Sequence, residues 1–290
     1  MTILFLLCLA VLALLMKLIV LRGPDRSKAH NRAFVLSPIL TPESFKRSRP
    51  LSTIPGLCLR TLLVWGALWL YYWIYGILVR TFDIPRFYLG YLAAPVVLLM
   101  GEGGFGVISL LWLPSGRLLP PLHRQPLLAR GVADFWGRRW NLWFSDWFRH
   151  ALFARMWRRP GVALFWVFFV SGLMHEWVLN LPLWLVTGRR CFGTMMLYFL
   201  LQAGGVLVEH QSVRGGLNTR SPGRESGLTS PASPVEGGPE MPAVICSNNS
   251  TGALLSRALL KRLLVWLVVL GPAPLLINEG LLRALHLWPK

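Results

Sequence analysis

Residues 1–21, MTILFLLCLAVLALLMKLIVL, form an apolar run that contains one charged side chain, Lys17. A helix rises 1.5 Å per residue, so about 20 apolar residues are needed to cross the roughly 30 Å hydrocarbon core of a bilayer. Lys17 lies close enough to the end of the run for its amine to reach the interface. No basic segment precedes the run and no small-residue cleavage site closes it, so we expect a retained transmembrane helix rather than a signal peptide.

Five further runs of comparable length follow along the chain. They cover residues 58–79, about 87–113, 161–187, 191–209 and about 259–278. The run at 87–113 contains Pro95 and the Gly-rich piece at 101–106, so it is either one kinked helix or two shorter pieces, and it is counted once. Of the 290 residues, 54% are apolar and 14% are charged, where soluble domains carry about 25% charged residues. The sequence therefore predicts an all-α, polytopic integral membrane protein with about six transmembrane helices, not a soluble globular enzyme.

The excess of basic residues follows these predicted spans. The chain has 30 Lys and Arg against 12 Asp and Glu, a formal charge of +18. Basic residues concentrate between the first and second runs and between the third and fourth, whereas the alternate loops carry only Arg80 and Arg86, or Arg189 and Arg190. By the positive-inside rule the two basic loops face the cytoplasm and both termini lie on the opposite side. Topology thus explains most of the charge, and nucleic-acid binding loses its main support.

Residues 212–252 differ in composition from the rest of the chain. Ser, Gly, Pro, Thr and Asn dominate there and aromatic residues are scarce. Such a segment cannot bury enough apolar surface to order itself, so we expect a flexible cytoplasmic loop between the fifth and sixth spans. Residues 1–211 and 253–290 then form a single membrane-embedded domain. The four cysteines lie far apart without metal-ligand spacing, which argues against a disulfide framework or a metal site.

The stretch DFWGRRWNLWFSDW at 134–147 carries four tryptophans spaced 4, 3 and 4 residues apart, Trp136, Trp140, Trp143 and Trp147. The spacing predicts one amphipathic helix at the cytoplasmic interface, with all four indoles on one face. One interpretation is an interfacial anchor. The other is the mouth of a site for an amphiphile with an anionic head, in which Arg138 and Arg139 pair with phosphates while the aromatic face borders the lipid tail. Asn141 lies within this stretch, and a buried amide needs partners.

The fourth run contains SGLMHE at 171–176, which places two adjacent titratable residues, His175 and Glu176, at membrane depth. Ionisable groups there are costly and are functional candidates by default; the alternative is a His that only hydrogen-bonds a neighbouring helix. Ser171 lies one turn earlier on the same face and is positioned to orient the imidazole. Glu176 points about 100° away from His175, so we expect its partner on another helix.

Three other chemistries lack sequence support. A zinc protease motif HExxH would need His at position 179, where the residue is Leu179. The piece GEGGFG at 101–106 lacks the Gly-Lys-Ser/Thr ending of a phosphate loop, which favours close helix packing or a kink there. Its Glu102 needs a partner at membrane depth, either an Arg or the substrate cavity. No Gly-x-Ser-x-Gly elbow supports a covalent serine mechanism.

The segment DFWGRRWN at 134–141, followed 34 residues after Asn141 by the His of SGLMHE, resembles the wax-synthase-like branch of the membrane-bound O-acyltransferase superfamily. The resemblance covers residues from about 121 to 210, under a third of the chain. It implies a multi-helix membrane fold in which a cytoplasm-facing tunnel admits an acyl thioester and a second entrance admits a hydroxyl acceptor.

By this resemblance, His175 matches the family's catalytic histidine and would take the proton of the acceptor hydroxyl. Asn141 would hold the thioester carbonyl or the developing oxyanion. Arg138 and Arg139 would then meet the phosphates of coenzyme A. The expected substrate-binding residues are Trp136, Arg138, Arg139, Trp140, Ser171 and Glu176.

Acyl-CoA is the expected co-substrate, with no resident cofactor or metal, and the leading acceptor is a long-chain alcohol. Other small hydroxyl compounds are alternative acceptors. The expected host membrane is the bacterial inner membrane or the endoplasmic reticulum. The competing class is a non-enzymatic transporter or assembly subunit, in which His175, Glu176 and Glu102 form a proton or ion path.

Overall fold

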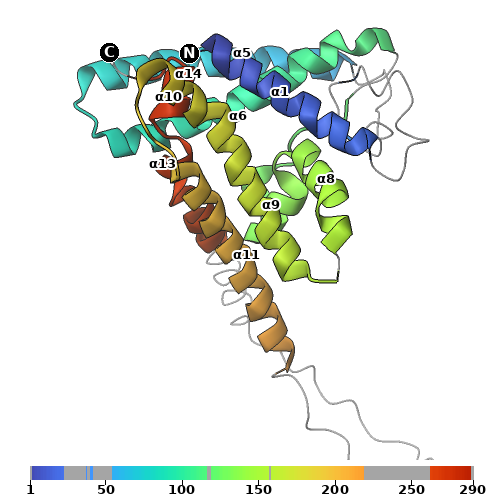
Figure 1. Cartoon of the computed structure of the whole chain (residues 1–290). Coiled ribbons are helices and arrows are strands. Elements are labelled where there is room, and N and C mark those ends of the chain that lie inside the picture. The colour runs from blue at the N-terminus through green and yellow to red at the C-terminus, as the bar shows by residue number, and fades with distance from the viewer. Residues whose placement is uncertain are drawn as a thin grey trace, which may run out of the picture.

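The computed structural model describes residues 2–22, 37, 40–41, 54–115, 119–156, 158–218 and 262–288, and every regular element within them is helical (Figure 1). Four of these helices are long and apolar enough to cross a membrane. They are α1 (Thr2–Leu21), α5 (Ile54–Thr81), α6 (Arg86–Leu111) and the continuous stretch Pro160–Thr187. The predicted all-α integral membrane fold is confirmed, and the first four predicted spans correspond to these helices.

The fifth and sixth predicted spans do not reach the same standard. The fifth lies in α11 (Thr194–Asn218), which is long enough but carries Gln202, Glu209 and Gln211 along its length. The sixth is a shorter apolar stretch, Arg262–Leu276, which includes α13 (Ala273–Leu276). Within the described ranges, four helices therefore qualify as spans by length and composition where six were predicted.

The predicted loop at 212–252 begins later than its composition suggested. α11 continues to Asn218, so residues 212–218 are helical. The first proline of the segment is Pro222, and a helix that is already nucleated extends over a few polar residues at little cost. The remainder of the predicted loop, 219–252, lies outside the described residues.

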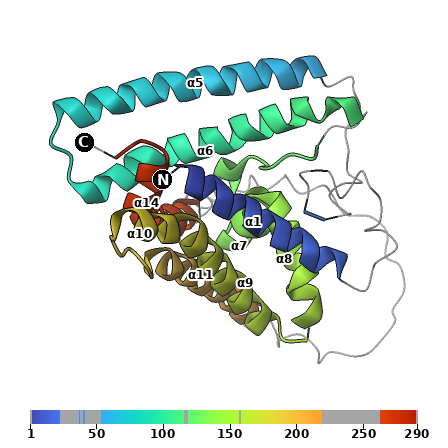
Figure 2. The same ribbon diagram turned by 45° about the horizontal axis from the view of Figure 1, so that its top comes forward.

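Two helix pairs make up most of the fold. α5 and α6 lie side by side, and α11 packs along α9 (Pro160–His175), running steeply away from the first pair (Figures 1 and 2). The predicted close packing at the Gly-rich piece is confirmed. A Cβ on Gly103 would lie 3.1 Å from the indole nitrogen of Trp65, and one on Gly106 would overlap the hydroxyl of Thr61. Small residues on α6 thus let α5 approach closely.

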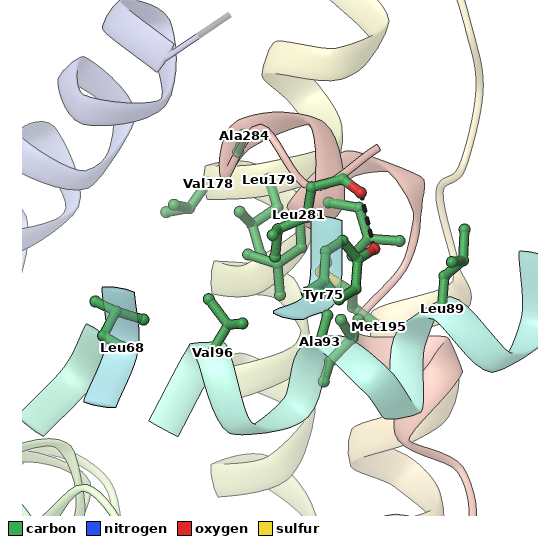
Figure 3. Packing of buried hydrophobic residues seen from close by; sticks show 13 residues of the cluster. Leu68, Tyr75, Leu89, Ala93, Val96, Val178, Leu179, Met195, Leu281 and Ala284 are labelled. Carbon is green, nitrogen blue, oxygen red and sulfur yellow. Dashed lines mark hydrogen bonds between the residues drawn. The ribbon is translucent and has the colours of Figure 1, made fainter. Parts of the chain in front are cut away.

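Three clusters of buried apolar residues hold the pairs together. The first joins α5, α6, the start of α11 and α14 (Glu279–Ala284), and the hydroxyl of Tyr75 donates a hydrogen bond of 2.8 Å to the carbonyl of Leu287 within it (Figure 3). The second joins α1 and α6 to α8 (Leu142–Ala151) through Met16, Phe105 and Trp147. The third surrounds Phe135 between α9 and α11. These last two clusters enclose the segment that carries the predicted site.

Candidate functional site

The tryptophan stretch is not one helix. A short α7 (Val132–Asp134) leads into a π-helical turn, Phe135–Arg139, after which Trp140 is extended, with φ −98° and ψ 132°. Asn141 then adopts the left-handed conformation, φ 40° and ψ 63°, and α8 begins at Leu142. The prediction of four indoles on one face is therefore wrong, because the chain turns between Trp140 and Leu142 and separates the first two indoles from the last two.

Three of the four indoles hydrogen-bond the segment to other parts of the protein. Trp136 donates to Oε1 of Gln202 on α11 at 3.1 Å, Trp143 donates to the carbonyl of Pro120 at 3.1 Å, and Trp147 donates to the carbonyl of Met16 on α1 at 3.0 Å. Trp143 and Trp147 are only 9% and 2% exposed. A buried indole nitrogen needs an acceptor, and each of these has one. The interfacial anchor interpretation is thus wrong for Trp143 and Trp147.

Asn141 combines a strained backbone with an unused polar atom. A non-glycine residue in the left-handed region costs on the order of 1 kcal/mol and persists where its surroundings hold it. The side-chain oxygen Oδ1 is buried and has no hydrogen-bond partner among the described residues. Buried polar atoms are rarely left unpaired, so this oxygen is available to a donor from a bound molecule.

His175 is the last residue of α9, directly before a second π-helical turn, Glu176–Asn180. Its Nδ1 lies 2.7 Å from the backbone carbonyl of Ser171, and its ring packs on Phe199 of α11 with centroids 4.5 Å apart. A carbonyl only accepts hydrogen bonds, so Nδ1 carries the proton and the neutral ring keeps its lone pair on Nε2. The imidazole is thereby held in the tautomer that a general base uses through Nε2.

Ser171 orients His175, but by another atom than the sequence suggested. The serine side chain was expected to hold the imidazole, whereas the contact is made by the main-chain carbonyl one turn earlier in α9. Ser171 itself is 9% exposed. Any residue that keeps the helix would provide this acceptor.

Glu176 is 7% exposed, and its carboxylate is occupied by protein donors. Oε1 accepts from the backbone N–H groups of Gly193, Met195 and Met196 at 2.9–3.1 Å, which closes the N-terminus of α11. Oε2 accepts from Nδ2 of Asn180 at 2.6 Å. The partner on another helix that we predicted is therefore present. These contacts fix the π turn that follows His175 onto α11.

Arg138 and Arg139 line a pocket of about 450 Å³ together with Arg130, Gly131, Ala133, Asp134, Glu209 and His210. Arg139 is 20% exposed and donates to Asp134 at 2.6 Å, whereas Arg138 is 79% exposed and lies 3.4 Å from the same carboxylate. Partial desolvation raises the pKa of Asp134. The hydrogen bonds from the Arg139 side chain and the Arg130 amide, together with the charges of Arg139 and Arg138, outweigh this effect and lower the pKa. The pocket presents an arginine to an anion from solvent.

The two predicted catalytic residues are linked through aromatic rings rather than directly. Neither Asn141 nor His175 lines the arginine pocket, and no hydrogen bond joins them among the described residues. A series of ring contacts with centroids 4.4–5.8 Å apart runs between their neighbourhoods: His175, Phe199, Trp136, Phe135, Trp140 and His123. Trp140 is the residue next to Asn141. The predicted substrate-binding residues Trp136 and Trp140 thus lie between the two candidates.

Several residues of this region could not be predicted from the sequence. His123, Phe199 and Gln202 contact the tryptophan segment, and Glu209 accepts from the amide of Ala133 just before it; none of the four has a motif around it. Glu102 was singled out because it lies at membrane depth, and its partners are Arg60 and His123. The predicted arginine partner is confirmed, while His123 could have been found only through the fold.

Comparison with known proteins identifies the same segment. Residues 119–201 match the model of the membrane bound O-acyl transferase family. The chain is 34% identical over 141 residues to "Probable long-chain-alcohol O-fatty-acyltransferase 1" of Arabidopsis thaliana, covering 40% of this chain and 39% of that protein. It is 31% identical over 145 residues to "Long-chain-alcohol O-fatty-acyltransferase" of Simmondsia chinensis, covering 36% and 41%.

A third relative, "Acyl-CoA--sterol O-acyltransferase 1" of Arabidopsis thaliana, is 30% identical over 111 residues, covering 35% of this chain and 31% of that protein. The aligned region thus spans less than half the length of each of these relatives. The family-model match at residues 119–201 contains the tryptophan segment, Asn141 and His175. Residues 119–201 therefore match the membrane bound O-acyl transferase family, and the resemblance to its wax-synthase-like branch is confirmed.

Proposed function

We propose that this integral membrane protein transfers an acyl group from acyl-CoA to the hydroxyl of a long-chain alcohol, forming an ester. The observation that carries the proposal is the state of His175 within the family-matched segment. Its Nδ1–H is engaged by the Ser171 carbonyl, which leaves Nε2 as a base about 22 Å along the helix from Pro160. A histidine so placed in the membrane is a functional candidate by default.

The reaction needs one base and one group that holds the carbonyl. Nε2 of His175 takes the proton of the alcohol as its oxygen attacks the thioester carbon, so that a C–O bond forms. When the tetrahedral intermediate collapses, the C–S bond breaks and the thiolate leaves. The imidazolium returns its proton to that sulfur, so neither a resident cofactor nor a metal is required.

Asn141 supplies the second group in this proposal. Its amide nitrogen would donate to the thioester carbonyl, where negative charge develops. The buried Oδ1 has no partner among the described residues, so the carboxamide is available to a bound molecule. The left-handed backbone turn presents this amide at the start of α8. The carboxamide would then hold the thioester while His175 takes the proton of the alcohol.

Acyl-CoA recognition is assigned to the arginine pocket. Guanidinium groups pair with phosphate in a bidentate manner, and Arg138 is exposed at its rim. We expect the loop from 113 to 160 and this pocket to face the cytoplasm of the host membrane, either the bacterial inner membrane or the endoplasmic reticulum. A sterol is the second acceptor class, since one relative is named for a sterol O-acyltransferase.

The non-enzymatic alternative is not favoured. An ion path through His175, Glu176 and Glu102 would need these groups to exchange protons with one another. Glu176 is occupied by the amides of α11 and by Asn180, whereas Glu102 contacts Arg60 and His123. No hydrogen bond or ion pair connects the two carboxylates in the described part of the chain.

The test is incorporation of labelled acyl-CoA into ester by membranes that contain the full-length protein. Long-chain alcohols and a sterol are supplied in parallel. We expect ester with an alcohol, and we expect His175→Ala to lower its rate by about 10²–10⁴-fold. His286→Ala, which changes a histidine beyond α14, serves as the matched control. The proposal is wrong if the wild-type protein forms no ester from any acceptor, or if His175→Ala retains the wild-type rate.

A further inference from the structure

A cluster of ionisable side chains lies beside the candidate site without a role in the proposed reaction. Glu102, on α6, is contacted on Oε2 by Arg60 of α5, and its Oε1 lies 2.9 Å from Nδ1 of His123. The side chains of Glu102 and His123 are only 13% and 4% exposed. A carboxylate buried at membrane depth is costly unless it is paired, and here it has two basic partners.

The ring of His123 also packs on the tryptophan segment. Its ring centroid lies 4.4 Å from that of Trp140. Two backbone hydrogen bonds of 2.8 Å flank this contact: the Arg124 amide donates to the Arg139 carbonyl, and the Leu142 amide donates to the Leu122 carbonyl. Residues 122–124 are therefore joined to the chain on both sides of Trp140 and Asn141.

These contacts explain how Asn141 keeps an unfavourable backbone conformation. The left-handed turn at Asn141 has no glycine to relieve it, and its side chain makes no capping bond to α8. Its neighbours Arg139 and Leu142 are instead held by residues 122–124. That segment is tied through His123 to Glu102, and Glu102 belongs to the long helix α6.

We propose that the Glu102–His123 pair is a positioning element for Asn141, fixing its carboxamide relative to α6. The pair does not touch the reacting atoms in this arrangement; it acts through the Trp140 ring and the two backbone hydrogen bonds. The inference deepens the proposed function and rests on it for its catalytic meaning. Small displacements of a group that stabilises a transition state lower the turnover rate more than they weaken substrate binding.

The kinetic test uses the full-length protein in membranes with acyl-CoA and the preferred alcohol. We expect Glu102→Leu to lower kcat by about tenfold and to leave KM for acyl-CoA within about twofold. Glu102→Gln retains an acceptor for His123 and should recover most of kcat. The matched control is Glu279→Leu, because Glu279 likewise has two basic partners, Arg189 and Arg283, and its side chain is 14% exposed. Equal losses in Glu102→Leu and Glu279→Leu would overturn the inference.

A double variant separates positioning from general damage. If Glu102 acts through Asn141, adding Glu102→Leu to Asn141→Ala should lower kcat no further, because the positioned group is already absent. If the two losses multiply, the proposal is wrong. His123→Phe keeps a ring against Trp140 but removes the Nδ1 contact with Glu102. We expect it to lower kcat as Glu102→Leu does, and to cause no further loss when it is added to Asn141→Ala.

Hydrogen exchange gives a readout that does not depend on activity. In Glu102→Leu, the amides of residues 122–124 and 139–142 should exchange faster than in wild type, while residues 176–196 keep their protection. Unchanged exchange at 139–142 would contradict the positioning role. If the wild-type protein forms no ester, the proposed function fails, and this measurement alone still decides whether the pair holds the Asn141 turn.

Discussion

The imidazole of His175 donates through Nδ1 to the backbone carbonyl of Ser171, 2.7 Å away and one helical turn earlier. The contact lies within α9, so the orientation of the ring is a property of the helix itself. It follows that the serine hydroxyl is not the group that sets the tautomer of His175.

We therefore expect Ser171→Ala to keep its rate of ester formation within about threefold of wild type, since the carbonyl acceptor remains and only the hydroxyl is removed. Labelled acyl-CoA incorporation by membranes with equal amounts of each variant measures this. A loss in Ser171→Ala as large as that in His175→Ala would show that the hydroxyl, not the carbonyl, is required.

Glu176→Ala should destabilise the fold rather than only reduce activity. The substitution leaves three backbone amides, at 193, 195 and 196, without their acceptor and removes one of the two acceptors of Asn180 Nδ2. Removing one partner from such a buried network costs about 3–5 kcal/mol. The midpoint of thermal unfolding of the detergent-solubilised protein measures this loss of stability. Trp177→Leu is the control, because Trp177 is the next residue of the same helix and is 46% exposed. Similar midpoints for Glu176→Ala and wild type would contradict this role.

Gly172 sets the distance between α9 and α11 next to His175. A Cβ at this position would lie 3.0 Å from Met196 Cα and 2.9 Å from its sulfur. Gly172→Ala should therefore push the helices apart, cost about 1–3 kcal/mol of unfolding free energy and loosen Phe199 over the imidazole. Gly161→Ala, on the same helix, meets only a methyl group of Leu207 at 3.9 Å and should be tolerated. Equal stability of the two variants, measured by thermal unfolding, would exclude the steric argument.

The Asp134 carboxylate should stabilise the fold in a pH-dependent way. Its pKa is lowered in the folded protein, against the ordinary carboxyl value of about 4. The stabilisation is therefore complete above that ordinary value and is lost as the pH falls through the folded pKa, because the unfolded chain takes up the proton first. The free energy of unfolding of wild type minus that of Asp134→Asn should be constant near neutral pH and shrink on acidification. A difference that grows on acidification would show that the pKa of Asp134 is not lowered in the folded protein.

The long apolar helices and the segment that carries the site could be predicted from the sequence, but the geometry of that segment could not. The spans at α1, α5 and α6 follow from hydropathy and length, which are local properties of the chain. The spacing of the tryptophans predicted a continuous helix. This prediction was wrong because periodicity contains no information on the hydrogen bonds that Arg139 and Leu142 make with residues 122–124. Those contacts are brought about by the fold, and they end the helix at Trp140.

The same limit applies around the histidine. Membrane depth singled out His175 and Glu176, and helix geometry sent Glu176 to another helix. Its particular partners, the amides at 193–196, lie 17 to 20 residues further along the chain and could be identified only from the arrangement of α9 and α11. The π turn at Glu176–Asn180 has no sequence signature that distinguishes it from ordinary helix.

That π turn holds one residue more than regular winding needs. A π turn accommodates one residue more than an α-helical turn, so the flanks on its two sides keep nearly the relative facing of an α-helix that is one residue shorter. Deleting one residue between 176 and 180 would restore regular winding and leave His175 facing Phe199. The contacts that such a deletion would break are those made within the turn, by Glu176 with the Met195 amide and by Asn180 with Asn278, 3.0 Å from it. The additional residue thus serves the contacts of Glu176 and Asn180 rather than the direction of the helix.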